Sequence, residues 1–182
     1  MSKSIGNVIS PYDLIDRYGT EATRYILLRH VHPFDDSDLT MAKMDEHYTA
    51  SLVNGIGNLT ARIMKLAETH LTTPPTEPEP TIDSVYQSAL DDFNYQAALD
   101  QIWKKISALD EKITTTEPLK IIKSDREAAI KIITELVLEL YQIGYLLRSA
   151  MPETAEVIMT AVKTNKKPTN LFSRLEDKAV KK

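Results

Sequence analysis

Apolar residues recur at spacings of three and four along most of this chain, which is the pattern of amphipathic helices. The longest apolar stripe covers residues 39–71 and predicts one helix about 45 Å long at 1.5 Å rise per residue. A second stripe follows Asn94, which can cap a helix, and a third follows the capping-box pattern Ser124-Asp125-Arg126-Glu127. The third stripe, which reaches Ala150, is apolar nearly all round and predicts the buried helix.

Shorter helices are predicted at both ends and between the stripes. Ser10 can cap a helix that Gly19 ends, and Thr20 can cap another over residues 21–30. The four prolines of 72–81 predict an extended connection, which is followed by short helices at 82–90 and, after Pro152, to about residue 162. These elements predict an all-α fold, an antiparallel helix bundle preceded by a small α-rich connector. We expect three parts: a connector over 1–38, the bundle over 39–165, and a loosely held charged tail over 166–182.

Composition narrows the classes of function. The chain has 182 residues, 42% of them hydrophobic, and no cysteine, so it contains neither disulfides nor cysteine-ligated zinc. No stretch approaches the ~20 apolar residues of a membrane span, which predicts a cytoplasmic protein without a membrane partner. The formal net charge of −4 argues against indiscriminate binding of nucleic acid, DNA included, but allows a local basic face.

The first residues carry the most specific motif. Ser2-Lys3-Ser4 is followed by Gly6-Asn7-Val8-Ile9-Ser10-Pro11 and by the run from Tyr18 to Tyr25. This arrangement resembles the mobile signature loop of class I aminoacyl-tRNA synthetases, Lys-Met-Ser-Lys-Ser, without its leading lysine. The resemblance implies that Ser2, Lys3 and Ser4 bind ATP, with magnesium, and that Lys3 neutralises charge developing on pyrophosphate.

Such a loop works beside a nucleotide-binding domain. We therefore expect that a catalytic domain precedes this sequence in the full enzyme and is missing here. The isolated chain is then predicted to hold no cofactor and to be inactive in aminoacylation.

Within class I, the sequence is most similar to methionyl-tRNA synthetases. The similar segments are Asp13 to Arg29, Asn54 to Arg62, Met151 to Glu156 and Leu171 to Glu176. In that family the helical bundle reads the anticodon CAU of its tRNA. The resemblance therefore implies that this chain is the anticodon-binding portion of a methionine–tRNA ligase.

Six residues are predicted to bind RNA. Asn58 and Arg62 match the family's anticodon-binding asparagine and arginine, and because they are four apart they share one helix face. Asn54 and Lys65 extend the same polar stripe. Pro118-Leu119 stands where the family has Pro-Trp, so the stacking of tryptophan on a base, about 1–3 kcal/mol, is replaced by an apolar contact.

Other interpretations stay open. The polar stripe is also typical of a solvated helix face, and Lys104, Lys105, Lys120 and Lys123 could face either RNA or solvent. The chain could instead be a standalone, non-catalytic tRNA-binding or scaffold module derived from a synthetase, or a helical protein-interaction module. Trp103 is predicted to pack inside the bundle. No metal site is predicted, because His30 and His32, with Asp35, Asp36 and Asp38, match no compact ligand pattern.

Overall fold

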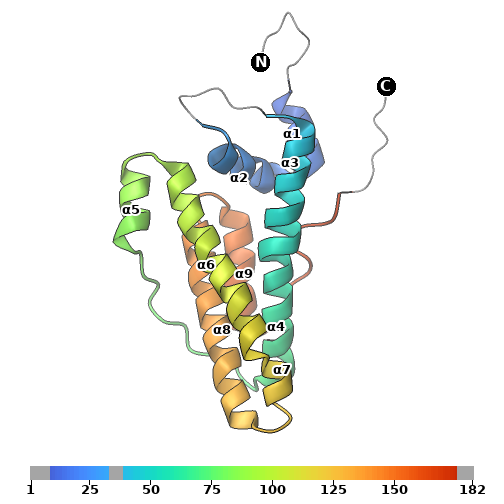
Figure 1. The fold of residues 1–182 in the computed structure, drawn as a ribbon, viewed down its shortest axis with the longest axis vertical. Coiled ribbons are helices and arrows are strands. Elements are labelled where there is room, and N and C mark those ends of the chain that lie inside the picture. Colours follow the sequence, from blue (N-terminus) through green and yellow to red (C-terminus); the bar gives the residue numbers. More distant parts are fainter. Residues whose placement is uncertain (1–8, 33–38, 176–182) are drawn as a thin grey trace, which may run out of the picture.

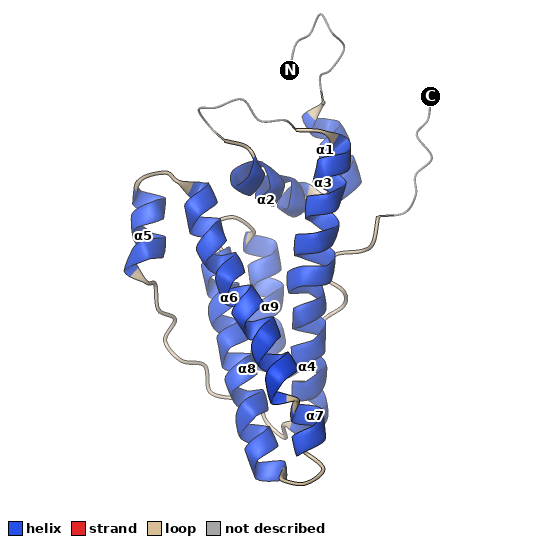
Figure 2. Ribbon diagram, in the orientation of Figure 1, coloured by secondary structure: helices blue, strands red, loops and turns tan. Residues whose placement is uncertain are grey.

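The computed structural model describes residues 9–32 and 39–175, and every regular element within these ranges is a helix (Figures 1 and 2). The helices are α1 (Pro11–Tyr18), α2 (Thr20–His30), α3 (Met41–His47), η2 (Tyr48–Gly57), α4 (Asn58–His70), α5 (Ser84–Asp91), α6 (Tyr95–Thr116), α7 (Pro118–Ile121), α8 (Arg126–Leu147) and α9 (Pro152–Thr164). The predicted all-α class is confirmed. None of the described helices is long and apolar enough to cross a membrane.

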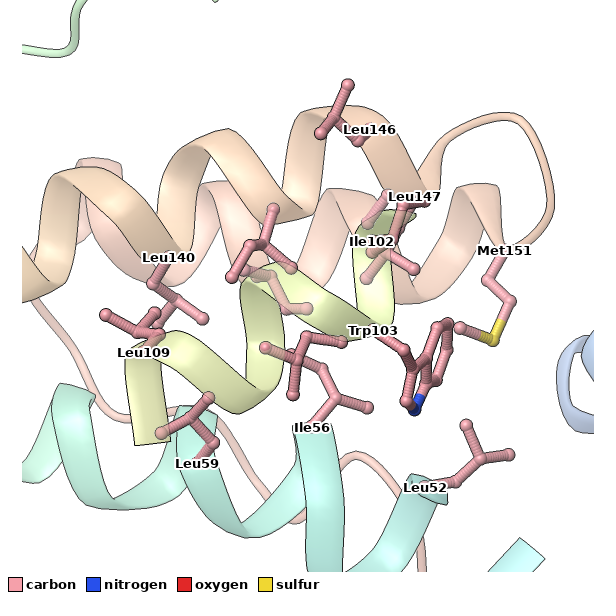
Figure 3. Packing of buried hydrophobic residues seen from close by; sticks show 14 of the residues in the cluster. Leu52, Ile56, Leu59, Ile102, Trp103, Leu109, Leu140, Leu146, Leu147 and Met151 are labelled. Carbon is pink, nitrogen blue, oxygen red and sulfur yellow. The ribbon is translucent and has the colours of Figure 1, made fainter. Parts of the chain in front are cut away.

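Four long helices, α4, α6, α8 and α9, form the bundle (Figure 1). Of these, α8 packs against the other three. Its residues Ile133, Leu136 and Leu140 have no exposed surface, which confirms the prediction that this helix is the buried one. Figure 3 shows Leu59 of α4 on the side of Leu109 of α6, with Ile56 of η2 nearer Trp103. Burial of apolar side chains of this kind is worth about 1.5–3 kcal/mol each and is the main stabilising term of the bundle.

The predicted long helix over 39–71 is helical from Met41 to His70, but its middle is not α-helical. The ten residues of η2 form a π-helix, and Gly55 has non-helical angles of φ −81° and ψ −109°. A Cβ on Gly57 would lie 2.7 Å from the carbonyl oxygen of Leu52, five residues earlier. Only glycine allows this approach of backbone to backbone, so the wider turn depends on Gly57.

Most predicted helix ends are confirmed by their caps. The Ser10 hydroxyl accepts a hydrogen bond from the Tyr12 amide at 3.2 Å, and Gly19 ends α1 at φ 82°. Two details are corrected. Thr20 is the first residue of α2 rather than its cap. Asp125, not Ser124, caps α8, because its carboxylate accepts from the Ala128 amide at 3.0 Å.

The two N-terminal helices pack on the bundle partly through polar contacts that are half-buried. Arg17 donates two hydrogen bonds to the carboxylate of Asp45, at 2.7 and 2.6 Å, and the Tyr18 hydroxyl donates to the same group at 2.6 Å. The Arg17 guanidinium therefore holds the pKa of Asp45 below its usual value. Arg24 donates to the carbonyl of Ala150 at 2.9 Å. The described connector residues thus share one core with the bundle, and the division at residue 38 stays a prediction.

The chain after α9 lies along α4 and η2. The Asn165 side chain donates to the carbonyl of Leu71 at 3.0 Å, and the Tyr48 hydroxyl donates to the carbonyl of Ser173 at 2.8 Å. The ring of Phe172 meets Tyr48 edge-on at 6.1 Å. Residues 165–175 are therefore attached to the bundle at both ends, unlike the loosely held tail that the sequence predicts. Residues 176–182 lie outside the described part of the chain.

Candidate nucleic-acid interface

A groove of about 820 Å³ lies between α4, the end of α6, and α7. Arg62 and Lys65 line it from α4, and Pro118 and Leu119 line it from α7. Four of the six predicted RNA-binding residues thus meet in one groove, although the pair on α4 and the pair on α7 are more than fifty positions apart in the sequence. Its lining contains four cationic side chains (Arg62, Lys65, Lys120 and Lys167) and one carboxylate, that of Glu117.

The turn between α6 and α7 sets the apolar side of the groove. Glu117 takes the left-handed conformation at φ 42° and ψ 55°, which ends α6, and Pro118 then begins α7 with its fixed φ. Pro118 is buried, whereas Leu119 is 57% exposed. An exposed leucine beside several cations offers a surface for the face of an unpaired base.

Arg62 is held in place by a residue on a second helix. Its Nη1 atom lies 2.5 Å from Oδ1 of Asp110 on α6, and the Arg62 side chain is still 40% exposed. A guanidinium has five N–H donors in a planar fork, so one ion pair leaves donors for a ligand. Lys65 lies 3.3 Å from Glu68, and Lys120 lies 2.5 Å from Glu117. These cations are paired at the surface, where salt bridges are weak and can exchange partners.

The other two predicted residues lie in a neighbouring pocket. Asn54 and Asn58 are both exposed and line a pocket of about 250 Å³ together with Asn170 and Arg174. Ala61 lines both this pocket and the groove, so the two hollows adjoin along α4. Their lining contains amide, guanidinium and apolar groups, which suit hydrogen bonds to base edges and contacts to base faces.

The residues of the C-terminal segment that line these hollows were not predicted. Lys167 lines the groove, and Asn170 and Arg174 line the pocket. The sequence carries a signal for them, because residues 163–175 contain four basic residues and no acidic one (Lys163, Lys166, Lys167 and Arg174). That signal becomes informative only once the segment is known to lie along α4.

Trp103 packs inside the protein, which confirms its predicted role. Its ring is 8% exposed and stacks on Tyr25 with centroids 4.4 Å apart. The Arg29 guanidinium lies 4.6 Å from the centre of the same indole and donates to Asp100 at 2.9 Å. These contacts attach α2 to α6 and leave the indole out of the groove.

His30 of the connector stacks on His47, the last residue of α3. The rings of His30 and His47 lie parallel with centroids 3.7 Å apart. Burial, with the nearby His47 and Arg29, lowers the pKa of His30 to about 4. In residues 9–32 and 39–175 no three His, Asp or Glu side chains gather in a metal-binding arrangement. Asp35, Asp36 and Asp38, like Ser2, Lys3 and Ser4 of the signature loop, lie outside the described residues.

Comparison with known proteins gives the class and then the family. The family described as tRNA synthetases class I (M) matches residues 1–64. Methionine–tRNA ligases from Fusobacterium nucleatum and Caldanaerobacter subterraneus are 33% and 31% identical over 94% and 85% of this chain. The chain spans 29% and 26% of the length of these relatives.

A solved structure shares the fold over nearly the whole chain. Methionyl-tRNA synthetase from Mycobacterium tuberculosis, bound by methionyl-adenylate, superposes with a TM-score of 0.80 at 22% identity, over 95% of this chain and 41% of the other. The sequence matches given above place the chain among the class I aminoacyl-tRNA synthetases. Within that class it belongs to the methionyl-tRNA synthetase family. None of these relatives supports a standalone module.

Proposed function

We propose that this chain is the tRNA anticodon-binding portion of a methionine–tRNA ligase, the enzyme that attaches methionine to its tRNA with ATP. The observation that carries the proposal is the groove in which Arg62 and Lys65 of α4 meet Pro118 and Leu119 of α7. Such a groove brings cations, polar donors and an exposed apolar side chain to one end of a rigid bundle. This combination suits an RNA loop whose bases are unstacked.

Each hollow supplies a different kind of contact. In the groove, the free donors of Arg62 bond to a base edge or a phosphate, while Leu119 contacts the face of a base. In the neighbouring pocket, the amides of Asn54 and Asn58 donate and accept hydrogen bonds, which can tell one base from another. The partner is a tRNA with the anticodon CAU, and the two hollows along α4 bind successive anticodon bases.

For the catalytic step, this chain supplies its signature loop. We assign Lys3, with Ser2 and Ser4, to ATP and its magnesium ion, in partnership with a nucleotide-binding domain that carries the rest of the active site. The reaction takes place in the cytoplasm, where tRNA is charged. With ATP, methionine and tRNA, the isolated chain gives no methionyl-tRNA, and measurable charging would contradict this assignment.

The test of anticodon binding compares two arginine variants. Arg62→Ala removes a guanidinium that lines the groove, whereas Arg148→Ala removes an exposed one at the end of α8, where it lies over the ring of Tyr145. Each variant is titrated with a CAU tRNA and with the same tRNA carrying another anticodon. Arg62→Ala abolishes the preference for CAU and Arg148→Ala retains it. If both variants keep the wild-type preference, Arg62 has no part in reading the anticodon.

A further inference from the structure

The C-terminal segment, residues 165–175, gives this acidic protein a local basic surface. Between residues 163 and 175 there are four basic and no acidic residues, although the whole chain carries a formal charge of −4. Within the described part of the chain, Lys166, Lys167 and Arg174 form no ion pair. Arg62, Lys65 and Lys120, in contrast, are each paired with a carboxylate. The cations that the segment brings to the two hollows are therefore not neutralised by a carboxylate of the described residues, in contrast to those of α4 and α7.

The bundle holds the segment in a fixed course beside the two hollows. Asn165 bonds to the carbonyl of Leu71, just after α4, and Ser173 bonds to Tyr48 on η2. Between these anchors, the Phe172 ring lies 3.6 Å from the position that a Cβ of Gly57 would occupy. The segment consequently runs antiparallel to α4, and Figure 1 shows it crossing behind that helix.

This course places one cation beside each half of the polar stripe. Lys167 lines the groove with Arg62 and Lys65, and Arg174 lines the pocket with Asn54 and Asn58. Lys65 and Asn54 are eleven residues apart, about 16 Å along a helix at 1.5 Å per residue. The two cations therefore lie in different hollows, one toward each end of the stripe.

We infer that the C-terminal segment binds the phosphate backbone of the RNA strand whose bases enter the groove and the pocket, with Lys167 and Arg174 as its main contacts. This inference rests on the proposed function and adds a division of labour to it. The side chains of α4 and α7 contact bases, and the segment contacts phosphates. Phosphate contacts carry affinity without sequence information, and each one adds to the salt dependence of binding.

The experiment uses the full chain and the double variant Lys167→Gln/Arg174→Gln, which removes two charges and keeps side chains of considerable length. Lys131→Gln/Arg148→Gln, on the exposed surface of α8, removes the same charge and is the matched control. Dissociation constants are measured over a series of salt concentrations for a CAU tRNA and for the same tRNA with another anticodon. Circular dichroism confirms that both variants are folded.

The segment variant is expected to weaken binding to both tRNAs equally and to leave their ratio unchanged. The slope of log K against log salt becomes shallower by about 1.4, since each contact to a single-stranded region contributes about 0.7. The control keeps the wild-type slope. An equal change of slope in the control overturns the inference, because it reduces the effect to net charge.

The remaining outcomes separate this inference from the proposed function. An unchanged slope in the segment variant, with the preference for CAU retained, overturns the inference alone. The segment would then contact a protein surface instead of RNA. A shallower slope without any preference for CAU supports the phosphate contact and contradicts anticodon reading. No binding of wild type to either tRNA overturns both.

Discussion

Arg62 on α4 and Asp110 on α6 form an ion pair, 2.5 Å from Nη1 to Oδ1, at the edge of the groove. The two residues are 48 positions apart, so no local sequence pattern predicts their contact. Because one edge of the guanidinium is bound to Asp110, its remaining donors have a defined direction. Asp110 is thus a positioning residue for Arg62.

Asp110→Asn tests this role. The variant keeps the shape of the side chain but loses the charge, so we expect the preference for CAU to fall about fivefold, on the order of 1 kcal/mol. The free energy of unfolding changes by less than about 1 kcal/mol, since both side chains are substantially exposed. Glu111→Gln removes a charge at the next position and should keep the full preference. If the two variants reduce the preference for CAU equally, the effect comes from the loss of a negative charge and not from the positioning of Arg62.

Leu119 provides a gain-of-function test. Leu119→Trp adds a ring at an exposed position of the groove, and base stacking is worth about 1–3 kcal/mol. We therefore expect binding of CAU tRNA to tighten by about fivefold or more, measured by fluorescence titration. Val85→Trp, at an exposed position on α5, controls for the added aromatic surface. No gain from Leu119→Trp, or an equal gain from the control, would show that residue 119 does not contact a base.

Local signals predicted the helices well because their causes are local. Ser10, Gly19 and Asn94 act within one turn of their own helices, so each end is visible in a few residues. The apolar stripe of the third helix likewise predicted that α8 is buried. The groove itself was not predicted, because Arg62 and Leu119 were named from family motifs and no spacing in the sequence brings them together.

What could not be predicted depends on contacts distant in sequence or on backbone geometry. The π-helix of η2 leaves the three-to-four apolar spacing nearly intact, so periodicity alone predicts a plain α-helix there. The course of residues 165–175 depends on Leu71 and Tyr48, each about a hundred or more positions away. As long as the course of this segment is unknown, Lys167 and Arg174 look like ordinary charged residues of a solvated tail.

Gly57 carries a prediction about η2. Gly57→Ala would bring a Cβ within 2.7 Å of the Leu52 carbonyl, so the backbone must shift. We expect a loss of about 1–3 kcal/mol in the free energy of unfolding, typical of overpacking, and a reduced preference for CAU because Asn54 and Asn58 flank the site. Urea denaturation gives the first value and tRNA titration the second. A variant as stable as wild type would show that the wide turn does not require glycine.

The lowered pKa of His30 predicts that the protein loses stability in acid. Its pKa is about 4 in the folded protein and near 6.5 when unfolded, so the unfolded chain binds the proton more tightly. The contribution of His30 is complete above pH 6.5 and is lost as the pH falls from 6.5 toward 4. We expect the free energy of unfolding to fall by about 1–2 kcal/mol through this group. This is less than the full ~1.36 kcal/mol per pKa unit because the ring is partly exposed.

Thermal denaturation at pH 7 and pH 4.5 measures this effect. His30→Gln removes the titrating ring, so the difference in stability between the two pH values should shrink relative to wild type. The neighbouring charges that act on His30 are His47 and Arg29, which lower its pKa further, and Asp100, which raises it. An unchanged pH dependence in His30→Gln would assign the acid sensitivity to other groups.

The most direct test of the central claim is the ratio of two dissociation constants for the wild-type chain. One is for a tRNA with the anticodon CAU and the other is for the same tRNA with a changed anticodon, both at low and at moderate salt. The account predicts at least tenfold tighter binding to CAU, about 1.4 kcal/mol, with a ratio that persists when salt weakens both complexes. Equal affinities at both salt concentrations would contradict it and leave only an electrostatic surface.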